Sequence, residues 1–521
     1  MHVSTCISVL IILCFFSPSK SLSNEVICDY TPFPSFCNSM RLQNNFGSLQ
    51  EYVRFILQQS ISSTQNVLSI IDGYLELRIG LQEYTFHALE DCQLLTSLNI
   101  DFFVITLEAI NFTDTIEGPT ASELLSLLSA TLTNYQTCLD GLEAVNPLSA
   151  IKIALQTPLS DGNMLNSVAL AIFKYAWIPH TREGKKLEDR KPQDAGLKLY
   201  PGGNAVNVSK SVVVNPNGSG DFTTVTDAVA AAPNNTDCTN GYFLIYIAAG
   251  VYKENVYIAK SKRYLMMIGD GIDQTIITGN RSVVDGWTTF NTATFAVTGV
   301  GFVAVNITFR NTAGAVMHQA VAVRNGADLS TFYQCSFEGY QDTLYAHTLR
   351  QFYRECNIYG TVDFIFGNAA VVFQNCNIYP RLPMEDQFNA ITAQGRIDIN
   401  QNTGTSIQNC TISAAEYMAS TKTYLGRPWK EYSRAVYLNS FIDKLIDPAG
   451  RVAWSGDFAL NTSYYAEYNN RGLGSDTSNR VTWEGYHVIN VSDATNFTVS
   501  NLLAGDFWLP STGVPYYGGL F

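Results

Sequence analysis

Two aspartates are spaced so that they could act together in one reaction. Asp342 lies in YQDTLY and Asp363 in GTVDFIFG, and 21 residues separate them, the same step that separates Cys335 from Cys356 in the similar segments FYQCSF and YRECNI. In a chain wound in coils of this length, the two carboxylates would stack about 4.8 Å apart. We expect one carboxyl pKa to rise and the other to fall, which gives a proton donor and a nucleophile for acyl or glycosyl transfer. Two ordinary turn residues are the structural alternative.

Four further side chains could assist these carboxylates. Gln341 precedes Asp342, and Gln319 lies 22 residues earlier, again about one coil. Two stacked amides could donate hydrogen bonds to an oxyanion. In YLGRPWKEY, Arg427 could hold a carboxylate by a bidentate pair and Trp429 could support a sugar ring. Taken singly, each of the four also has an ordinary structural role.

A repeat in the carboxy-terminal part of the chain indicates how these residues are positioned. Residues 205–521 contain short β-rich runs separated by Gly, Asn and Asp. Four similar segments place cysteines at 335, 356, 376 and 410, with steps of 21, 20 and 34 residues. A repeat near 20 residues with such turns predicts a parallel β-helix. The longer step requires an insertion, for which 380–405 is the candidate.

The amino-terminal part has a different periodicity. Apolar residues recur at helical spacing in four segments, with breaks expected at Gly118-Pro119, Pro147 and Pro158, and the segments are 48–75, 81–110, 121–145 and 163–176. This pattern predicts a helical bundle over residues 24–175. Cys28 and Cys37 flank two prolines, which suits a local disulfide.

The two remaining segments concern targeting and processing. Residues 1–23 contain an apolar run over 6–16, which predicts a secretory signal and is shorter than the roughly 20 residues that span a bilayer. No stable membrane span is therefore expected. Residues 176–204 form a linker, whose basic cluster over 182–191 is either a site for a processing protease or a solvated connector.

Composition excludes several classes of protein. The chain of 521 residues carries a net charge of −13, so a basic footprint for nucleic acid is not expected. It has only six histidines, none at zinc-ligand spacing to another His or to Cys, so no metal site is expected. With 46% hydrophobic residues, the chain can build sizeable cores.

Several motifs together resemble one enzyme family. GYQDTLY (339–345), IYGTVDFIFG (358–367), HQAVAVR (318–324) and LGRPW (425–429) resemble the plant pectin methylesterases in order and spacing, over nearly all of 206–521. In the amino-terminal part, TPFPSFC, ALEDC and TCLDG resemble the pectin methylesterase inhibitors. The resemblance implies an all-α four-helix bundle followed by an all-β right-handed parallel β-helix.

This resemblance also implies an activity and roles for the residues. The family hydrolyses the C6 methyl esters of homogalacturonan, which yields pectate and methanol in the cell wall outside the cell. Asp363 would be the nucleophile and Asp342 the general acid and then base, while Gln319 and Gln341 would stabilise the oxyanion. Arg427 would position Asp363 and contact substrate.

Further implications concern substrate contacts, cofactors and disulfides. Thr289, Phe366 and Trp429 would contact the sugar chain, as would Gln319. No metal or organic cofactor is implied. The family's disulfides would be Cys28–Cys37, Cys92–Cys138 and Cys376–Cys410, although Cys356 stacks between Cys335 and Cys376 and leaves other pairings open.

Two other functions remain possible. A backbone-cleaving pectin hydrolase or lyase could use the same fold, because carboxylates about 5 Å apart also suit a retaining glycosidase. Alternatively, the chain could be a secreted inhibitor or binding protein with an inactive β-helix. The bundle over residues 24–175 could cap the groove of its own β-helix until cleavage, or bind another secreted enzyme. We predict that it suppresses activity in the precursor.

Overall fold

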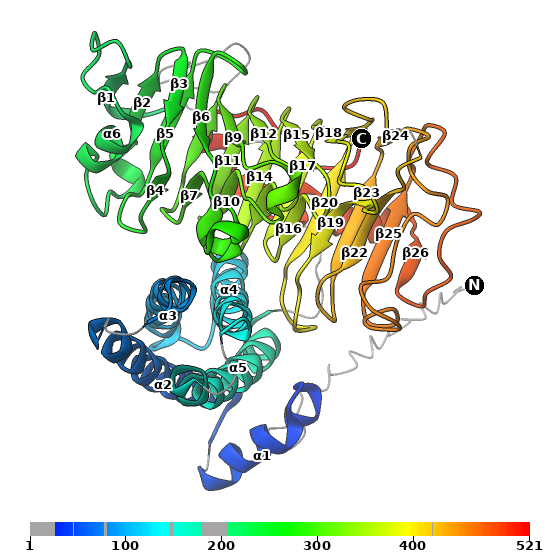
Figure 1. Ribbon diagram of the computed structural model, residues 1–521. Helices are drawn as coiled ribbons and strands as arrows, with labels where there is room; N and C mark the ends of the chain where they lie inside the picture. The colour runs from blue at the N-terminus through cyan, green and yellow to red at the C-terminus, as the bar shows by residue number, and fades with distance from the viewer. Residues whose placement is uncertain (1–26, 45, 78–80, 146–148, 179–205, 419) are drawn as a thin grey trace, which may run out of the picture.

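The computed structural model describes residues 27–44, 46–77, 81–145, 149–178, 206–418 and 420–521. The predicted signal segment 1–23 and all of the predicted linker beyond residue 178 lie outside these residues. The described part consists of a helical unit and a β-helix that pack against each other, with α3 and α4 nearest to the β-helix (Figure 1).

Four long helices form the helical unit, as predicted. They are α2 (Leu49–Leu77), α3 (Glu83–Ile110), α4 (Gly118–Glu143) and α5 (Ala150–Trp177), preceded by η1 (Ile27–Tyr30) and α1 (Pro34–Gln43). Their apolar faces follow the 3.6-residue period: Val53, Ile56 and Leu57 of α2 are all fully buried. By length and composition α3 could cross a membrane, but core helices share these features, and half of its residues are buried.

Both predicted disulfides of this unit are confirmed. Cys28–Cys37 joins η1 to α1, and Cys92–Cys138 joins α3 to α4. The predicted break at Pro158 is wrong, because α5 runs through this residue to Trp177. A proline inside a helix removes one hydrogen bond and strains the preceding turn. Leu155 and Leu159 on either side are fully buried, and this anchoring holds the helix together.

The β-helix consists of three parallel sheets, which confirms the predicted architecture. The 11-stranded sheet contains β1 (Val208–Val214), β2 (Tyr242–Ile247), β5 (Leu265–Gly269), β8 (Val303–Val305), β11 (Ser330–Tyr333), β14 (Arg350–Arg354), β17 (Ala370–Gln374), β20 (Gly404–Gln408), β23 (Arg434–Leu438), β25 (Tyr464–Tyr468) and β26 (Tyr486–Val488). The seven-stranded sheet contains β4 (Val256–Ile258), β7 (Phe295–Val297), β10 (Val323–Asn325), β13 (Leu344–Ala346), β16 (Ile365–Gly367), β19 (Asn389–Gln394) and β22 (Thr423–Pro428). The eight-stranded sheet contains β3 (Gly250–Lys253), β6 (Thr275–Gly279), β9 (Thr308–Asn311), β12 (Ser336–Glu338), β15 (Asn357–Gly360), β18 (Asn377–Pro380), β21 (Thr411–Ile412) and β24 (Phe441–Ile442).

The central coils, around Asp342 and Asp363, contribute one strand to each sheet, and residues 20 or 21 apart stack there. Leu344 of β13 pairs with Ile365 of β16, and Phe332 of β11 pairs with Tyr353 of β14. The long coil between Cys376 and Cys410 places its extra residues in the connections 381–388 and 395–403, inside the predicted insertion.

Aromatic rings stack in the same way inside the β-helix. The rings of Phe332 and Tyr353 lie 5.1 Å apart, and those of Tyr353 and Phe373 lie 4.7 Å apart.

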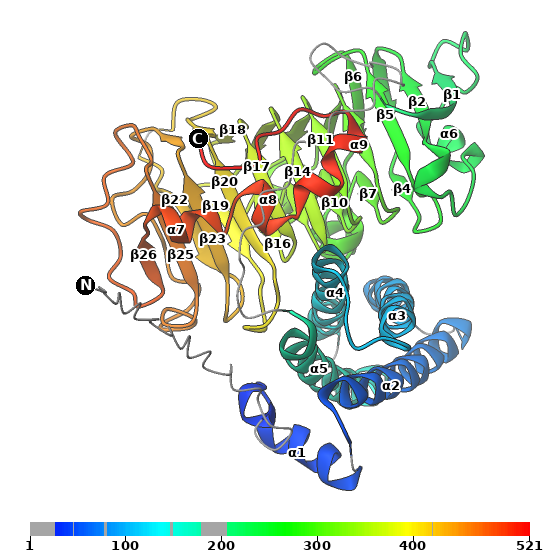
Figure 2. The same cartoon turned by 180° about the vertical axis from the view of Figure 1, so that it is seen from behind.

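Short helices from the two ends of its sequence pack on the β-helix unit. At the amino-terminal end, α6 (Val225–Ala231) contributes to the buried core. At the other end of the chain, α7 (Val491–Thr495), α8 (Val499–Leu502) and α9 (Leu509–Thr512) lie across the 11-stranded sheet (Figure 2).

The predicted Cys376–Cys410 disulfide is wrong. Both cysteines are buried free thiols, as are Cys335 and Cys356, and all four stack at equivalent positions of successive coils. The backbone N–H of Cys376 donates to Cys410 Sγ at 3.3 Å. Side chains at such positions run parallel about 4.8 Å apart, whereas a disulfide brings the Cβ atoms to about 3.8 Å.

Candidate active site

Asp342 and Asp363 occupy the same position in neighbouring coils. Each lies two residues before a strand of the seven-stranded sheet, and the backbone N–H of Asp342 donates to the carbonyl of Val362 at 3.0 Å. Both have left-handed backbone conformations, with φ of 61° and 53°. Residues other than Gly adopt this backbone region at a cost in conformational energy. Such strained residues are common at active sites. The geometry therefore places the two carboxyl groups side by side.

Arg427 of β22 reaches back to Asp363 across β19. Its Nε donates to Asp363 Oδ1 at 2.8 Å and its Nη2 to Oδ2 at 2.6 Å. This forked pair leaves only 7% of the Asp363 side chain exposed. A bidentate, charge-assisted contact fixes the carboxylate plane as well as its charge.

The two carboxyl groups titrate differently. Burial, strengthened by the neighbouring charge of Asp363, raises the pKa of Asp342 well above its usual value, while Arg427 opposes this rise. Burial also raises the pKa of Asp363, but the hydrogen bonds and charge of Arg427 oppose it. The expectation that one pKa falls is therefore wrong, since burial acts on both groups. The difference still makes Asp342 the better proton donor.

Gln319 and Gln341 lie one coil apart beside this pair. The backbone N–H of Ala320 donates to the carbonyl of Gln341 at 3.2 Å, which fixes their relative position. Both side chains are half-buried, and neither side-chain amide makes a hydrogen bond within the described residues. Their N–H groups are therefore available to a ligand.

Three aromatic side chains form a platform on the seven-stranded sheet. The Tyr345 and Phe366 rings stack 4.1 Å apart, and Trp429 lies 6.0 Å from Phe366 and 6.5 Å from Tyr345. We call Tyr345, Phe366 and Trp429 the aromatic platform. Thr289, the remaining predicted contact, begins the short helix η4 (Thr289–Thr292) and is half-buried.

Sequence reasoning missed three aromatic residues. Tyr345 lies three residues after Asp342 inside the quoted motif GYQDTLY, so its signal was present. The guanidinium of Arg427 lies 4.2 Å from the Trp454 ring centroid and 5.5 Å from that of Phe388. Trp454 follows Trp429 by about one coil, which could have revealed it. Phe388 lies in the inserted connection and gives no periodic signal.

The helical unit covers the platform. Tyr345, Phe366 and Trp429 belong to the same apolar cluster as Cys138 and Leu142 of α4. Next to them, Thr137 Oγ1 lies 2.9 Å from His347 Nε2, and burial lowers the pKa of His347 well below its usual value. A neutral imidazole thus contacts the α4 hydroxyl.

Polar contacts extend this cover on both sides. Asp91 of α3 accepts hydrogen bonds from Thr288 Oγ1 and Asn291 Nδ2, both at 2.5 Å. These two donors lie on either side of Thr289 in the chain. On the other side, Asn368 Nδ2 donates to Thr133 Oγ1 of α4 at 2.8 Å, and Gln401 Nε2 donates to the carbonyl of Ser129 at 2.7 Å. The helical unit therefore also contacts η4 through α3, and Asn368 and Gln401 through α4.

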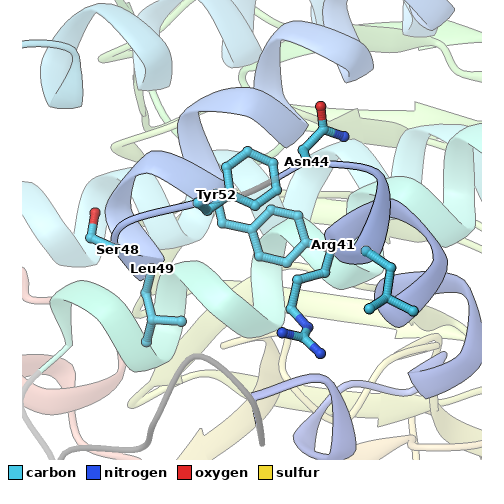
Figure 3. Close-up of a pocket in the computed structure, with 7 residues that line it drawn as sticks. Arg41, Asn44, Ser48, Leu49 and Tyr52 are labelled. Carbon is cyan, nitrogen blue, oxygen red and sulfur yellow. The ribbon is translucent and has the colours of Figure 1, made fainter.

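A separate cavity of about 260 Å³ lies in the helical unit, between α1 and the start of α2 (Figure 3). Its lining includes Arg41, Asn44, Ser48, Leu49 and Tyr52 and brings together no pair of titratable groups suited to catalysis. Within the described residues, no three His, Cys, Asp or Glu side chains are grouped to hold a metal ion.

Comparison with known proteins identifies the fold and its chemistry. Residues 211–506 match the family model described as Pectinesterase, and residues 24–172 match that described as Plant invertase/pectin methylesterase inhibitor. The chain belongs to the pectinesterase family. Pectinesterases are carboxylic ester hydrolases, and this chain combines pectin methylesterase activity with an inhibitor-like amino-terminal unit.

Individual relatives support this family membership over nearly the whole chain. The Arabidopsis thaliana protein described as "Probable pectinesterase/pectinesterase inhibitor 41" is 54% identical, over 96% of this chain and 95% of its own. The solved pectin methylesterase from carrot is 54% identical with a TM-score of 0.58, and covers 59% of this chain and 98% of its own. That from Aspergillus niger is 34% identical with a TM-score of 0.50, and covers 57% of this chain and 94% of its own.

Proposed function

We propose that the β-helix removes C6 methyl esters from homogalacturonan with Asp363 as nucleophile and Asp342 as general acid and base, and that the helical unit blocks this site in the precursor. The observation that carries the proposal is the forked Arg427–Asp363 pair one coil from a buried carboxyl group of higher pKa. No cofactor takes part in the proposed steps.

In the first step, a carboxylate oxygen of Asp363 attacks the ester carbonyl carbon. Arg427 keeps Asp363 ionised and aims its carboxylate plane. The tetrahedral oxyanion accepts hydrogen bonds from the side-chain amides of Gln319 and Gln341, a type of stabilisation that is commonly worth several kcal/mol (about 3). As the carbon–oxygen bond to the methoxy group breaks, the Asp342 carboxyl group gives its proton to the leaving methanol.

In the second step, water hydrolyses the acyl-enzyme. Asp342, now a carboxylate, accepts a proton from a water molecule, and the resulting hydroxide oxygen attacks the same carbonyl carbon. The bond to Asp363 breaks, which restores its carboxylate and releases the free acid of galacturonate. Asp342 is again protonated and the cycle is complete.

The helical unit occupies the surface that the sugar chain would use. Thr289, Phe366 and Trp429 are proposed substrate contacts, and α3 and α4 cover the platform and its neighbours. Cleavage by a protease within 176–204 would allow this unit to leave. Secretion to the cell wall is supported by the apolar segment 6–16 and by two disulfides, which persist outside the cell.

Methanol release from highly methyl-esterified pectin tests the chemistry. We expect residues 206–521 to release methanol without new reducing ends, and Asp363→Asn to lower kcat at least 10³-fold because it removes the nucleophile. Asp476→Asn, in an exposed turn, is the matched control. Reducing ends without methanol would instead assign the aspartates to backbone cleavage.

A cleavable linker tests the block. A site-specific protease sequence replaces residues 185–191 of the full chain, and methanol release is compared before cleavage, after cleavage, and after the two parts are separated. We expect activity to appear only once the helical unit is removed. Equal turnover in the intact and separated forms would refute the block and leave the esterase chemistry untouched.

A further inference from the structure

Arg451 is a buried arginine whose charge has no hydrogen-bonding partner. Only 1% of the residue is exposed, and none of its three guanidinium nitrogen atoms makes a hydrogen bond within the described residues. Arg480, which is also buried, is instead paired with Glu467 at 2.7 Å. Burial of an uncompensated charge costs stability, and proteins break such rules mainly at functional sites. The environment of Arg451 therefore points to a function.

The guanidinium group of Arg451 lies inside the β-helix, against the backbone of β22. Gly426 of β22 pairs with Arg451, and Arg451 Nη1 lies 3.0 Å from the position that a Cβ atom on Gly426 would take. The guanidinium carbon lies 4.4 Å from the centroid of the Tyr465 ring and 5.0 Å from that of Tyr437. Two cation–π contacts thus hold the side chain in place. The Tyr437 hydroxyl also donates to the carbonyl of Leu425 in β22, at 2.6 Å.

The segment that carries Arg451 also contacts Arg427. Two backbone hydrogen bonds, of 2.8 and 3.3 Å, join this segment to β22 at Gly426 and the residue before it. Three residues after Arg451, the Trp454 ring centroid lies 4.2 Å from the guanidinium carbon of Arg427. We call residues 450–454 the clamp segment. It holds β22 through its backbone and Arg427 through an aromatic ring.

We propose that Arg451 is a positioning residue, which anchors the clamp segment so that β22 and Trp454 aim Arg427 at Asp363. The inference rests on the proposed function, in which the forked pair of Arg427 and Asp363 prepares the nucleophile. Both bonds of the fork, at 2.8 and 2.6 Å, need one orientation of the guanidinium plane. A misplacement of about 1 Å can cost about a hundredfold in rate. Arg451 thus acts on the reaction through Arg427.

A double-mutant cycle tests this route. The β-helix is released from the full chain by linker cleavage and separated, and methanol release is measured for Arg451→Met, Arg427→Gln and the double variant. Methionine replaces the apolar stem of Arg451 and removes the guanidinium group. We expect Arg451→Met alone to lower kcat/KM about tenfold. The double variant should lose no more than about the hundredfold expected of Arg427→Gln alone, because both changes disturb one contact. Losses that multiply to about a thousandfold would overturn the proposal.

The pH profile gives a second readout, which a purely structural role would not change. Burial raises the pKa of Asp363 and Arg427 opposes this rise, so a loosened fork should move the acidic limb of kcat/KM to higher pH. We expect this shift in Arg451→Met and a smaller one in Arg451→Lys, which keeps the charge and the stem. An unmoved acidic limb in Arg451→Met would also overturn the proposal.

Two controls separate positioning from loss of stability and from loss of the reaction. Val436→Ala, in a separate apolar cluster of β23, should lower the unfolding temperature without moving the acidic limb. Should Arg451→Met fail to fold, the same cycle with Arg451→Lys decides between shared and multiplied losses. A wild-type β-helix that releases no methanol would refute the proposed function itself, so the two failures are distinguishable.

Discussion

At the scale of single residues, the forked contact of Arg427 with Asp363 controls when the nucleophile is ionised. Burial raises the pKa of Asp363, and the hydrogen bonds and charge of Arg427 oppose that rise. In Arg427→Gln, the pKa of Asp363 should rise further, so the acidic limb of the kcat/KM profile should move to higher pH. The lost alignment should also lower kcat/KM about a hundredfold at the optimum.

A pH profile of the separated β-helix measures both effects. Arg427→Lys is the matched variant, because it retains the charge and loses the fork. It should therefore shift the acidic limb less than Arg427→Gln while still losing alignment. An unmoved acidic limb in Arg427→Gln would mean that this residue does not set the ionisation of Asp363.

The stacking of Asp342 and Asp363 could be predicted from sequence, because coil length converts spacing into adjacency. The pairing of Arg427 with Asp363 followed from the resemblance to the pectin methylesterases. The rings of Phe388 and Trp454 around Arg427 could not be predicted. They come from connections between strands, whose paths depend on contacts far apart in the chain.

At the scale of structural elements, the stacked cysteines of the β-helix differ from the disulfides of the bundle. Cys335, Cys356, Cys376 and Cys410 are buried free thiols, whereas Cys238 is exposed. Burial raises the pKa of the Cys356 and Cys410 thiols well above their usual value, whereas in Cys376 the hydrogen bonds with these two neighbours outweigh burial and lower the pKa. It is therefore the burial of all four side chains that keeps a reagent away from them. In the chain from residue 24 onward, we expect a thiol reagent to label one cysteine in the native state and five after denaturation without reductant.

Mass spectrometry of labelled peptides measures this count. Cys238→Ser should show no native labelling and four labels after denaturation. Three labels in the denatured wild type would indicate that one pair of the stack is oxidised, contrary to the structure. The coil period was predictable from these cysteines, but their redox state was not, because it depends on Cβ geometry rather than on spacing. The continuation of α5 through Pro158 could not be predicted either, because the burial of Leu155 and Leu159 is a tertiary feature.

At the scale of the whole molecule, a buried carboxyl group lies between the two units. Burial raises the pKa of Asp91 to about 7, although the hydrogen bond from Thr288 and the charge of Arg324 oppose the rise. Its usual value is 3.8. The docked state therefore holds a proton that the separated helical unit releases between about pH 4 and pH 7. The proton-linked part of the docking free energy is fully present below about pH 4. It is lost as the pH rises from about 4 to about 7, and it does not change further at higher pH.

Affinity between the two parts, measured after linker cleavage from pH 4 to pH 8, tests this dependence. We expect roughly 10²- to 10³-fold weaker binding at pH 8 than at pH 4. Asp91→Asn cannot ionise; its single oxygen can still accept from Asn291 Nδ2, and its amide N–H can donate to the Thr288 hydroxyl instead. Its affinity should therefore vary much less over this range. Affinity that is independent of pH in the wild type would contradict this assignment. Sequence could suggest a covering bundle, but the contacting groups, such as Asp91 and Thr137, have no distinctive pattern.

The carboxy-terminal tail gives the molecule an order of assembly. Side chains of three successive coils donate hydrogen bonds to tail carbonyls: Gln374 to Tyr517, Gln408 to Phe497 and Asn439 to Phe521. These contacts form only after residues 497–521 have been synthesised, whereas the helical unit precedes them in the chain. Since domains generally fold in the order in which they emerge, the cover is present before the enzyme is finished. Under the proposed block, a newly made molecule is already covered when its β-helix is completed, and it becomes active only after the helical unit is removed.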